Sequence, residues 1–148
     1  MKQARFRLRM VDALPELLQG GVLYVTREQD LAAHLCACGC AHEVITPLSS
    51  TDWTLVLYRD GASLLPSIGN WAFACRSHYF IRCGRVVWAE DMSDSTVLRG
   101  RKFDRARKNR YYASQASSPS VLPYATPPEG YGMSWWSRLR TWLGRFLE

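Results

Sequence analysis

The chain has 148 residues, of which 47% are hydrophobic and 22% are charged, and its formal net charge is +6. This length and composition suit one globular domain with extensions. No apolar run approaches the roughly 20 residues of a membrane span, and residues 1–10 lack the apolar stretch of a signal peptide. We therefore expect a cytoplasmic protein.

The positive charge is unevenly distributed along the chain. Residues 11–98 carry five Arg and ten Asp or Glu, a net charge of −5, whereas residues 1–10 carry +4 and residues 99–110 carry +6. A protein that binds nucleic acid over its folded surface normally carries basic residues on that surface. The distribution therefore argues against nucleic acid as a partner.

Short β-type segments dominate the first two thirds of the sequence. Residues 5–10 alternate arginine with bulky apolar residues, which predicts a half-buried strand, and residues 22–26 are β-branched and aromatic, which predicts a buried one. We expect residues 28–35 to form a short helix. Further strands are predicted at residues 43–48, 53–59, 63–65, 79–82 and 85–89, with turns at Arg59-Asp60-Gly61 and Cys83-Gly84.

One basic helix is expected after the strands. Ser93 is a suitable N-cap, and residues 97–112 follow a helical pattern in which Val97, Phe103 and Tyr111 are available for packing. The many Lys and Arg residues of this segment are typical of a solvated helix face. The fold class is therefore predicted to be α+β, with a small, mostly antiparallel β-sheet domain followed by one C-terminal helix.

The remaining residues divide into two further segments, after a first domain of residues 1–113. Residues 114–132 are dense in Ser, Pro and Gly, which predicts a flexible linker. Residues 133–148 place three tryptophans and several leucines on one helical stripe and arginines mainly on the other, which predicts an amphipathic helix. This tail has three alternative binding sites. It could bind a membrane surface, which would associate the protein peripherally with lipid, a groove on a partner protein, or the chain's own domain.

The cysteines are spaced as metal ligands. Cys36, Cys38 and Cys40 alternate along one loop, and the segment Cys75-Arg-Ser-His78 offers a second pair of ligands. Zinc sites usually contain about four such ligands in two close-spaced groups. The sequence therefore predicts one structural zinc ion, although it leaves open which four residues bind it. We expect the remaining candidates, His34, His42 and Cys83, to have structural roles or to contact the metal ligands without binding the metal.

A histidine that does not bind the metal could act in catalysis. If the four cysteines fill the zinc shell, His78 is available as a general base, and Ser67 and Ser77 are candidate nucleophiles. Adjacent strand residues point to opposite faces, which favours Ser67 over Ser77 as the partner of His78. Asn70 is a candidate donor to an oxyanion.

The alternative to a catalytic site is a purely structural one, and the residues alone favour it. In this alternative, residues 66–70 form an ordinary turn and His78 is the fourth zinc ligand. Spacing does not choose an acidic third member for a triad. The candidates are Glu43, Asp52, Asp60, Glu90 and Asp91.

Three motifs together are similar to a known family. They are Cys-x-Cys-Gly-Cys at residues 36–40, Pro-Ser-Ile-Gly-Asn-Trp-x-Phe-x-Cys-Arg-Ser-His-Tyr-Phe-Ile at residues 66–81, and Val-Val-Trp at residues 86–88. Over about residues 20–112 the chain resembles a small bacterial family of metal-binding proteins that are encoded beside ubiquitin-like proteins and their activating-type and conjugating-type enzymes. Ala37 and His42 depart from the family pattern, and neither departure removes a candidate ligand.

The resemblance implies a role in bacterial ubiquitin-like conjugation. It implies a serine-type, deubiquitinase-like peptidase that processes or removes a ubiquitin-like protein, with that protein or its activating-type or conjugating-type enzymes as partners. Under the resemblance, the catalytic candidates are Ser67, Ser77 and His78, and the metal ligands are Cys36, Cys38, Cys40 and Cys75. The alternative is a non-catalytic, zinc-stabilised adaptor in the same pathway.

Overall fold

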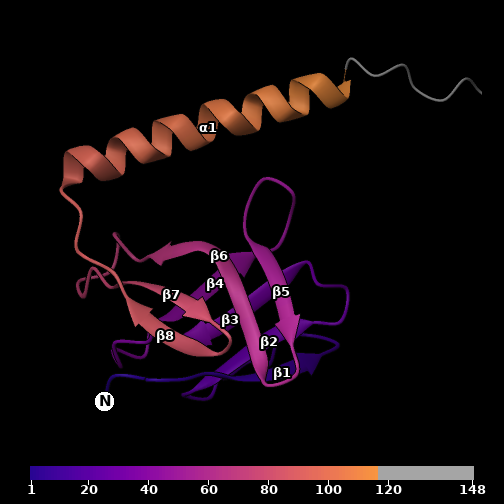
Figure 1. Cartoon of the computed structure of the whole chain (residues 1–148), viewed down its shortest axis with the longest axis vertical. Coiled ribbons are helices and arrows are strands. Elements are labelled where there is room, and N and C mark those ends of the chain that lie inside the picture. The colour runs from indigo at the N-terminus through magenta and orange to yellow at the C-terminus, as the bar shows by residue number, and fades with distance from the viewer. Residues whose placement is uncertain (117–148) are drawn as a thin grey trace, which may run out of the picture. The chain divides into compact units, whose positions relative to one another are not determined.

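The computed structural model describes residues 1–116, and Met1–Ala113 form one compact unit. This unit contains two four-stranded sheets and one helix (Figure 1). The predicted linker beyond residue 116 and the predicted amphipathic tail lie outside the described residues. Among residues 1–116, no helix combines the length and the hydropathy needed to cross a membrane.

The first sheet contains strands β1 to β4 in sequence order, and only β1 and β2 pair in parallel. The second sheet is an antiparallel meander of strands β5 to β8. The prediction of a mostly antiparallel α+β fold is therefore confirmed. The bounds are β1 Arg7–Val11, β2 Val22–Thr26, β3 Leu31–Leu35, β4 Glu43–Pro47, β5 Thr54–Tyr58, β6 Gly61–Gly69, β7 His78–Arg82, β8 Arg85–Trp88 and the helix α1 Asp94–Ala116.

The two sheets share one hydrophobic core. Leu23 and Val25 of β2 and Leu64, Tyr79 and Ile81 of β6 and β7 are each at most 1% exposed, and they belong to the same cluster of buried side chains. Burial of such apolar surface is the main favourable contribution to folding. The core therefore fixes the central strands β6 and β7, which carry the candidate catalytic residues.

The predicted helix at residues 28–35 is wrong. Residues 31–35 form the strand β3, which pairs antiparallel with both β2 and β4. A turn precedes the strand, in which the hydroxyl of Thr26 accepts hydrogen bonds from the backbone N–H groups of Asp30 and Leu31. The local helix propensity of Ala32 and Ala33 is thus overridden by pairing on both sides and by burial of these residues in the core.

The predicted turn at residues 66–70 is largely strand. β6 continues to Gly69, and its pairing with β7 is irregular between Leu64 and Ile68. Pro66 lies within this irregular stretch and has no backbone N–H to donate to a neighbouring strand. The resulting bulge leaves Ser67 half-buried at the surface of the second sheet.

The N-cap of α1 is as predicted, because the hydroxyl of Ser93 accepts a hydrogen bond from the backbone N–H of Thr96 at 3.3 Å. Of the residues available for packing, Val97 is buried, whereas Phe103 is 67% exposed. α1 also ends at Ala116, three residues inside the segment predicted as linker.

Polar contacts hold α1 on the β-rich body near both of its ends. Near the first turn, Arg76 Nη1 lies 2.9 Å from Asp94 Oδ1, and Arg76 Nη2 donates to the carbonyl oxygen of Met92 at 2.9 Å. Towards the other end, Lys108 forms an ion pair with Asp52. Two hydrogen bonds add to that anchor: Arg107 Nη2 to the carbonyl oxygen of Thr51 at 3.1 Å, and Ser50 Oγ to Tyr111 Oη at 2.7 Å.

Candidate functional site

Four cysteines converge from two loops. Cys36, Cys38 and Cys40 lie between β3 and β4, Cys75 lies between β6 and β7, and their sulfur atoms are all within 4.8 Å of one another. The shorter distances are 3.4 Å from Cys36 to Cys38, 3.7 Å from Cys40 to Cys75 and 3.9 Å from Cys36 to Cys75. None of the four forms a disulfide, and the cluster is the predicted one.

The cluster fits a tetrahedral metal ion. Four sulfurs at about 2.3 Å from a zinc ion lie ~3.8 Å apart at the corners of a tetrahedron, which is close to the observed spacing. The loop curls around this point because Gly39 adopts a φ of 89° and its N–H donates to the carbonyl oxygen of Cys36. Four protein ligands would complete the coordination shell, which is the arrangement of a structural site.

The thiols of the cluster differ in acidity. Burial raises the pKa of Cys38 to about 12. Burial also raises the pKa of Cys75, but hydrogen bonds from the side chain and backbone of Ser77, together with those of Cys38 and Cys40, outweigh it, and the pKa falls to about 6. The pKa of Cys75 is thus shifted towards the thiolate form that binds cations, and a bound cation would deprotonate the other thiols.

Ser67 and His78 lie together on neighbouring strands. His78 is directly opposite Gly69 in the register of β6 and β7, and Ser67, two residues before Gly69, is on the same face of the sheet. His78 Nε2 lies 3.0 Å from Ser67 Oγ. This is the distance expected between a nucleophile and its general base.

The second ring nitrogen of His78 determines which tautomer is present. Nδ1 lies 2.7 Å from the main-chain carbonyl oxygen of Glu90. A carbonyl oxygen only accepts hydrogen bonds, so Nδ1 carries the proton and Nε2 of the neutral ring presents its lone pair to Ser67. His78 is 7% exposed, which holds the imidazole in this orientation.

Both ring nitrogens of His78 are engaged away from the four sulfurs. The alternative in which His78 is the fourth metal ligand is therefore not supported, because four cysteine sulfurs converge without it. Nδ1 of a different histidine, His42, lies 3.3 Å from Cys40 Sγ. Buried His34 contacts the hydroxyl of Tyr79, and burial lowers the pKa of His34 to about 3.

Ser77 points the other way, into the core. It is 6% exposed, and its Oγ lies 3.0 Å from Cys36 Sγ and accepts a hydrogen bond from Asn70 Nδ2 at 2.9 Å. The structure thus separates Ser77 from His78, as expected for adjacent strand residues. Asn70 is committed to the same buried network, so it is not positioned as the oxyanion donor considered from sequence.

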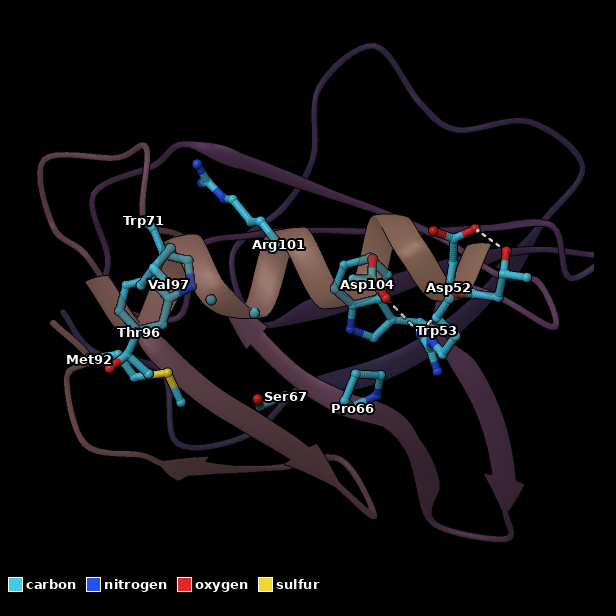
Figure 2. Close-up of a pocket in the computed structure, with 14 residues that line it drawn as sticks. Asp52, Trp53, Pro66, Ser67, Trp71, Met92, Thr96, Val97, Arg101 and Asp104 are labelled. Carbon is cyan, nitrogen blue, oxygen red and sulfur yellow. Dashed lines mark hydrogen bonds and ion pairs between the residues drawn. The ribbon is translucent and has the colours of Figure 1, made fainter. Parts of the chain in front are cut away.

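A pocket of about 370 Å³ opens beside Ser67. Figure 2 shows Pro66 and Ser67 on one side of it, Trp71 and Trp53 towards its two ends, and α1 across it. The helix contributes part of the lining, including Val97, Gly100 and Asp104. The half-buried Ser67 hydroxyl is therefore accessible from a cavity of the size that proteins use for ligands.

Three contributors to the site were not identified from sequence. The main-chain carbonyl of Glu90 was missed because only its carboxyl group was considered, and a carbonyl carries no residue-type signal. Trp71, whose ring centroid is 5.0 Å from that of His78, was not weighed as a site residue. The wall formed by α1 depends on contacts between distant parts of the chain.

The fold and site thus define a small two-sheet protein with a four-cysteine cluster and a Ser–His pair beside a pocket. The model of the bacterial ubiquitination-like system serine protease family (BubE) matches residues 10–89, more than half of the chain. The chain belongs to this family, which confirms the resemblance found in the sequence. The match ends before α1 begins. No curated protein and no solved structure matches the chain.

Proposed function

We propose that the chain is a serine peptidase in which Ser67 is the nucleophile and His78 is the general base. The observation that carries this proposal is the 3.0 Å contact between His78 Nε2 and Ser67 Oγ, with Nδ1 engaged by a carbonyl oxygen and a pocket beside the serine. Membership of a serine protease family supports the same reaction class.

The mechanism follows from this geometry. As Ser67 Oγ attacks the substrate carbonyl carbon, His78 Nε2 takes the hydroxyl proton and then delivers it to the leaving amine, which gives an acyl-enzyme. A water molecule then attacks the acyl-enzyme with His78 again as the base, which releases the carboxylate product and restores Ser67. The Glu90 carbonyl stabilises the imidazolium through Nδ1–H, although less strongly than a carboxylate would.

A structural zinc ion on Cys36, Cys38, Cys40 and Cys75 is the second part of the proposal. The support is the soft, four-sulfur donor set at tetrahedral spacing. Such an ion would tie the loop at residues 36–40 to the segment that runs directly into His78. Its contribution would be to hold the base in place, and the coordination shell would leave no open position for a substrate.

The substrate is proposed to be a ubiquitin-like protein of the same conjugation system, either as a precursor with a C-terminal extension or as a conjugate. The family description supports a ubiquitination-like pathway. The activating-type and conjugating-type enzymes of that pathway are further proposed partners, and the cytoplasm is the proposed location.

Incubation with a ubiquitin-like protein from the same gene neighbourhood, extended by a short C-terminal peptide, tests the proposal by intact mass. We expect cleavage by the wild type and by Ser77→Ala, and loss of cleavage in Ser67→Ala and His78→Ala with zinc content unchanged. Absence of cleavage by the wild type would favour the adaptor alternative, in which the zinc-stabilised domain only binds its partners.

A further inference from the structure

The part of α1 between its two anchors does not pack tightly on the body. Its inward face is small or polar, with Thr96, Gly100 and Asp104 lining the pocket and only Val97 buried. A helix that served only to cover a core would present a continuous apolar stripe. α1 instead crosses over an open space next to Ser67 (Figure 2).

Gly100 lies near the middle of this span. Glycine is unfavourable inside a helix relative to alanine or leucine. A Cβ added at Gly100 would meet no atom within 4 Å, so the surrounding protein does not require a glycine there. Because Gly100 lines the pocket, a long side chain there would take up part of its space.

Trp53 gives a second, independent indication of a ligand. Its indole Nε1 is buried and has no hydrogen-bond partner among the described residues, although Trp53 lines the pocket. Buried donors are nearly always hydrogen-bonded in folded proteins. Because this nitrogen is closed off from solvent, a carbonyl oxygen of a ligand would reach it after a small shift of the indole towards the pocket.

We propose that the pocket beneath α1 is the subsite for the substrate chain next to the scissile bond, and that it takes an extended peptide segment. α1 forms the roof, Gly100 leaves room for the chain, and Trp53 Nε1 donates to a main-chain carbonyl oxygen. This inference rests on the proposed function of Ser67.

An extended segment fits this site better than a folded surface. The roof is held on the body by Arg76 near one end and by Lys108 towards the other, so the helix covers the subsite. An extended chain needs about half the width of a helix, which is 10–12 Å across with its side chains. The helix that forms the roof lies outside residues 10–89, whereas Pro66, Ser67 and Trp71 of the same pocket lie inside the family match.

The test compares Gly100→Leu with Ala106→Leu, a matched change on the same helix at an exposed residue that does not line the pocket. Two rates are measured for each protein: labelling of Ser67 by a small fluorophosphonate, and cleavage of the ubiquitin-like protein with a C-terminal extension. Trp53→Phe, which removes only the N–H and part of the ring, is the second test variant. Thermal melting verifies that each variant folds.

We expect the ratio of the cleavage rate to the labelling rate to fall at least tenfold in Gly100→Leu. In Trp53→Phe it should fall about fivefold to tenfold, because one hydrogen bond to the substrate is lost. Ala106→Leu should keep the wild-type ratio. An unchanged ratio in folded Gly100→Leu and Trp53→Phe would overturn the subsite and leave the peptidase intact. A wild type that neither labels nor cleaves, or that labels without cleaving, would overturn the proposed function and this inference with it.

Discussion

The indole of Trp71 lies against the imidazole of His78, with ring centroids 5.0 Å apart and planes inclined by 55°. Trp71 can take this position because Gly69 has no side chain, and a Cβ at Gly69 would collide with the indole nitrogen. The guanidinium of Arg76 lies over the Trp71 ring, 5.5 Å from its centroid. The imidazole of His78, the proposed general base, is therefore held from the side by an aromatic ring that is itself covered by Arg76.

Trp71 should act as a positioning residue. We expect Trp71→Leu to slow fluorophosphonate labelling of Ser67 by about tenfold, because the imidazole would lose its lateral contact and its alignment with Ser67. Trp71→Phe should restore most of the rate, since it retains an aromatic ring. Equal labelling rates in the wild type and Trp71→Leu would show that His78 needs no such support.

Ser77 should matter for stability and not for chemistry. In Ser77→Ala the buried amide of Asn70 loses its 2.9 Å acceptor, which should lower the free energy of unfolding by about 1–3 kcal/mol. Denaturant unfolding measures this loss, and the cleavage rate should stay within a few-fold of the wild type. A folded, zinc-containing Ser77→Ala protein without activity would contradict the assignment of Ser67.

The cysteine cluster should bind one zinc ion that stabilises the fold. Cys75→Ser should reduce the zinc content from about one per chain to near zero and destabilise the protein by several kcal/mol, since binding energy of a structural metal is folding energy. Cys83→Ser is the matched control, because Cys83 is an exposed thiol in the turn between β7 and β8. Metal analysis of the two variants should therefore differ, and full zinc retention in Cys75→Ser would remove Cys75 from the ligand set.

The anchor of α1 at Asp52 should weaken in acid. The hydrogen bond from Lys108 lowers the pKa of Asp52, with a further contribution from Ser49. A carboxyl whose pKa is lowered on folding stabilises the protein above its unfolded pKa of about 3.9, and this contribution is lost as the pH falls through the folded value.

The measurement is the difference in melting temperature between the wild type and Asp52→Asn. We expect a few degrees at pH 7, because a partly exposed pair contributes at most about 1 kcal/mol, and almost none once the pH is below the lowered pKa of Asp52. Lys108 also contacts Asp104 at 3.6 Å, so Asp104→Asn is the companion variant. A difference that persists unchanged at low pH would mean that Asp52 acts without its charge.

Local patterns in the sequence predicted most strands, the turn at Cys83-Gly84 and the N-cap of α1, because these depend on neighbouring residues. The strand β3 was missed because Ala32 and Ala33 favour helix locally and become strand only through two pairing partners. The cysteine cluster was predictable from spacing. Strand alternation separated Ser77 from His78 and so favoured Ser67, but the contact between Ser67 and His78 depends on the register of β6 and β7, which no local pattern determines.

The most direct test of the central claim is to label the purified protein with a fluorophosphonate and to map the modified residue by mass spectrometry. The phosphorus–fluorine bond is exchanged for a bond to an activated serine oxygen, so the reaction reports the nucleophile itself. We predict one adduct, on Ser67, which is absent in Ser67→Ala and strongly slowed in His78→Ala while Ser77→Ala reacts normally. An adduct on Ser77, or equal labelling of the wild type and His78→Ala, would contradict the Ser67–His78 site.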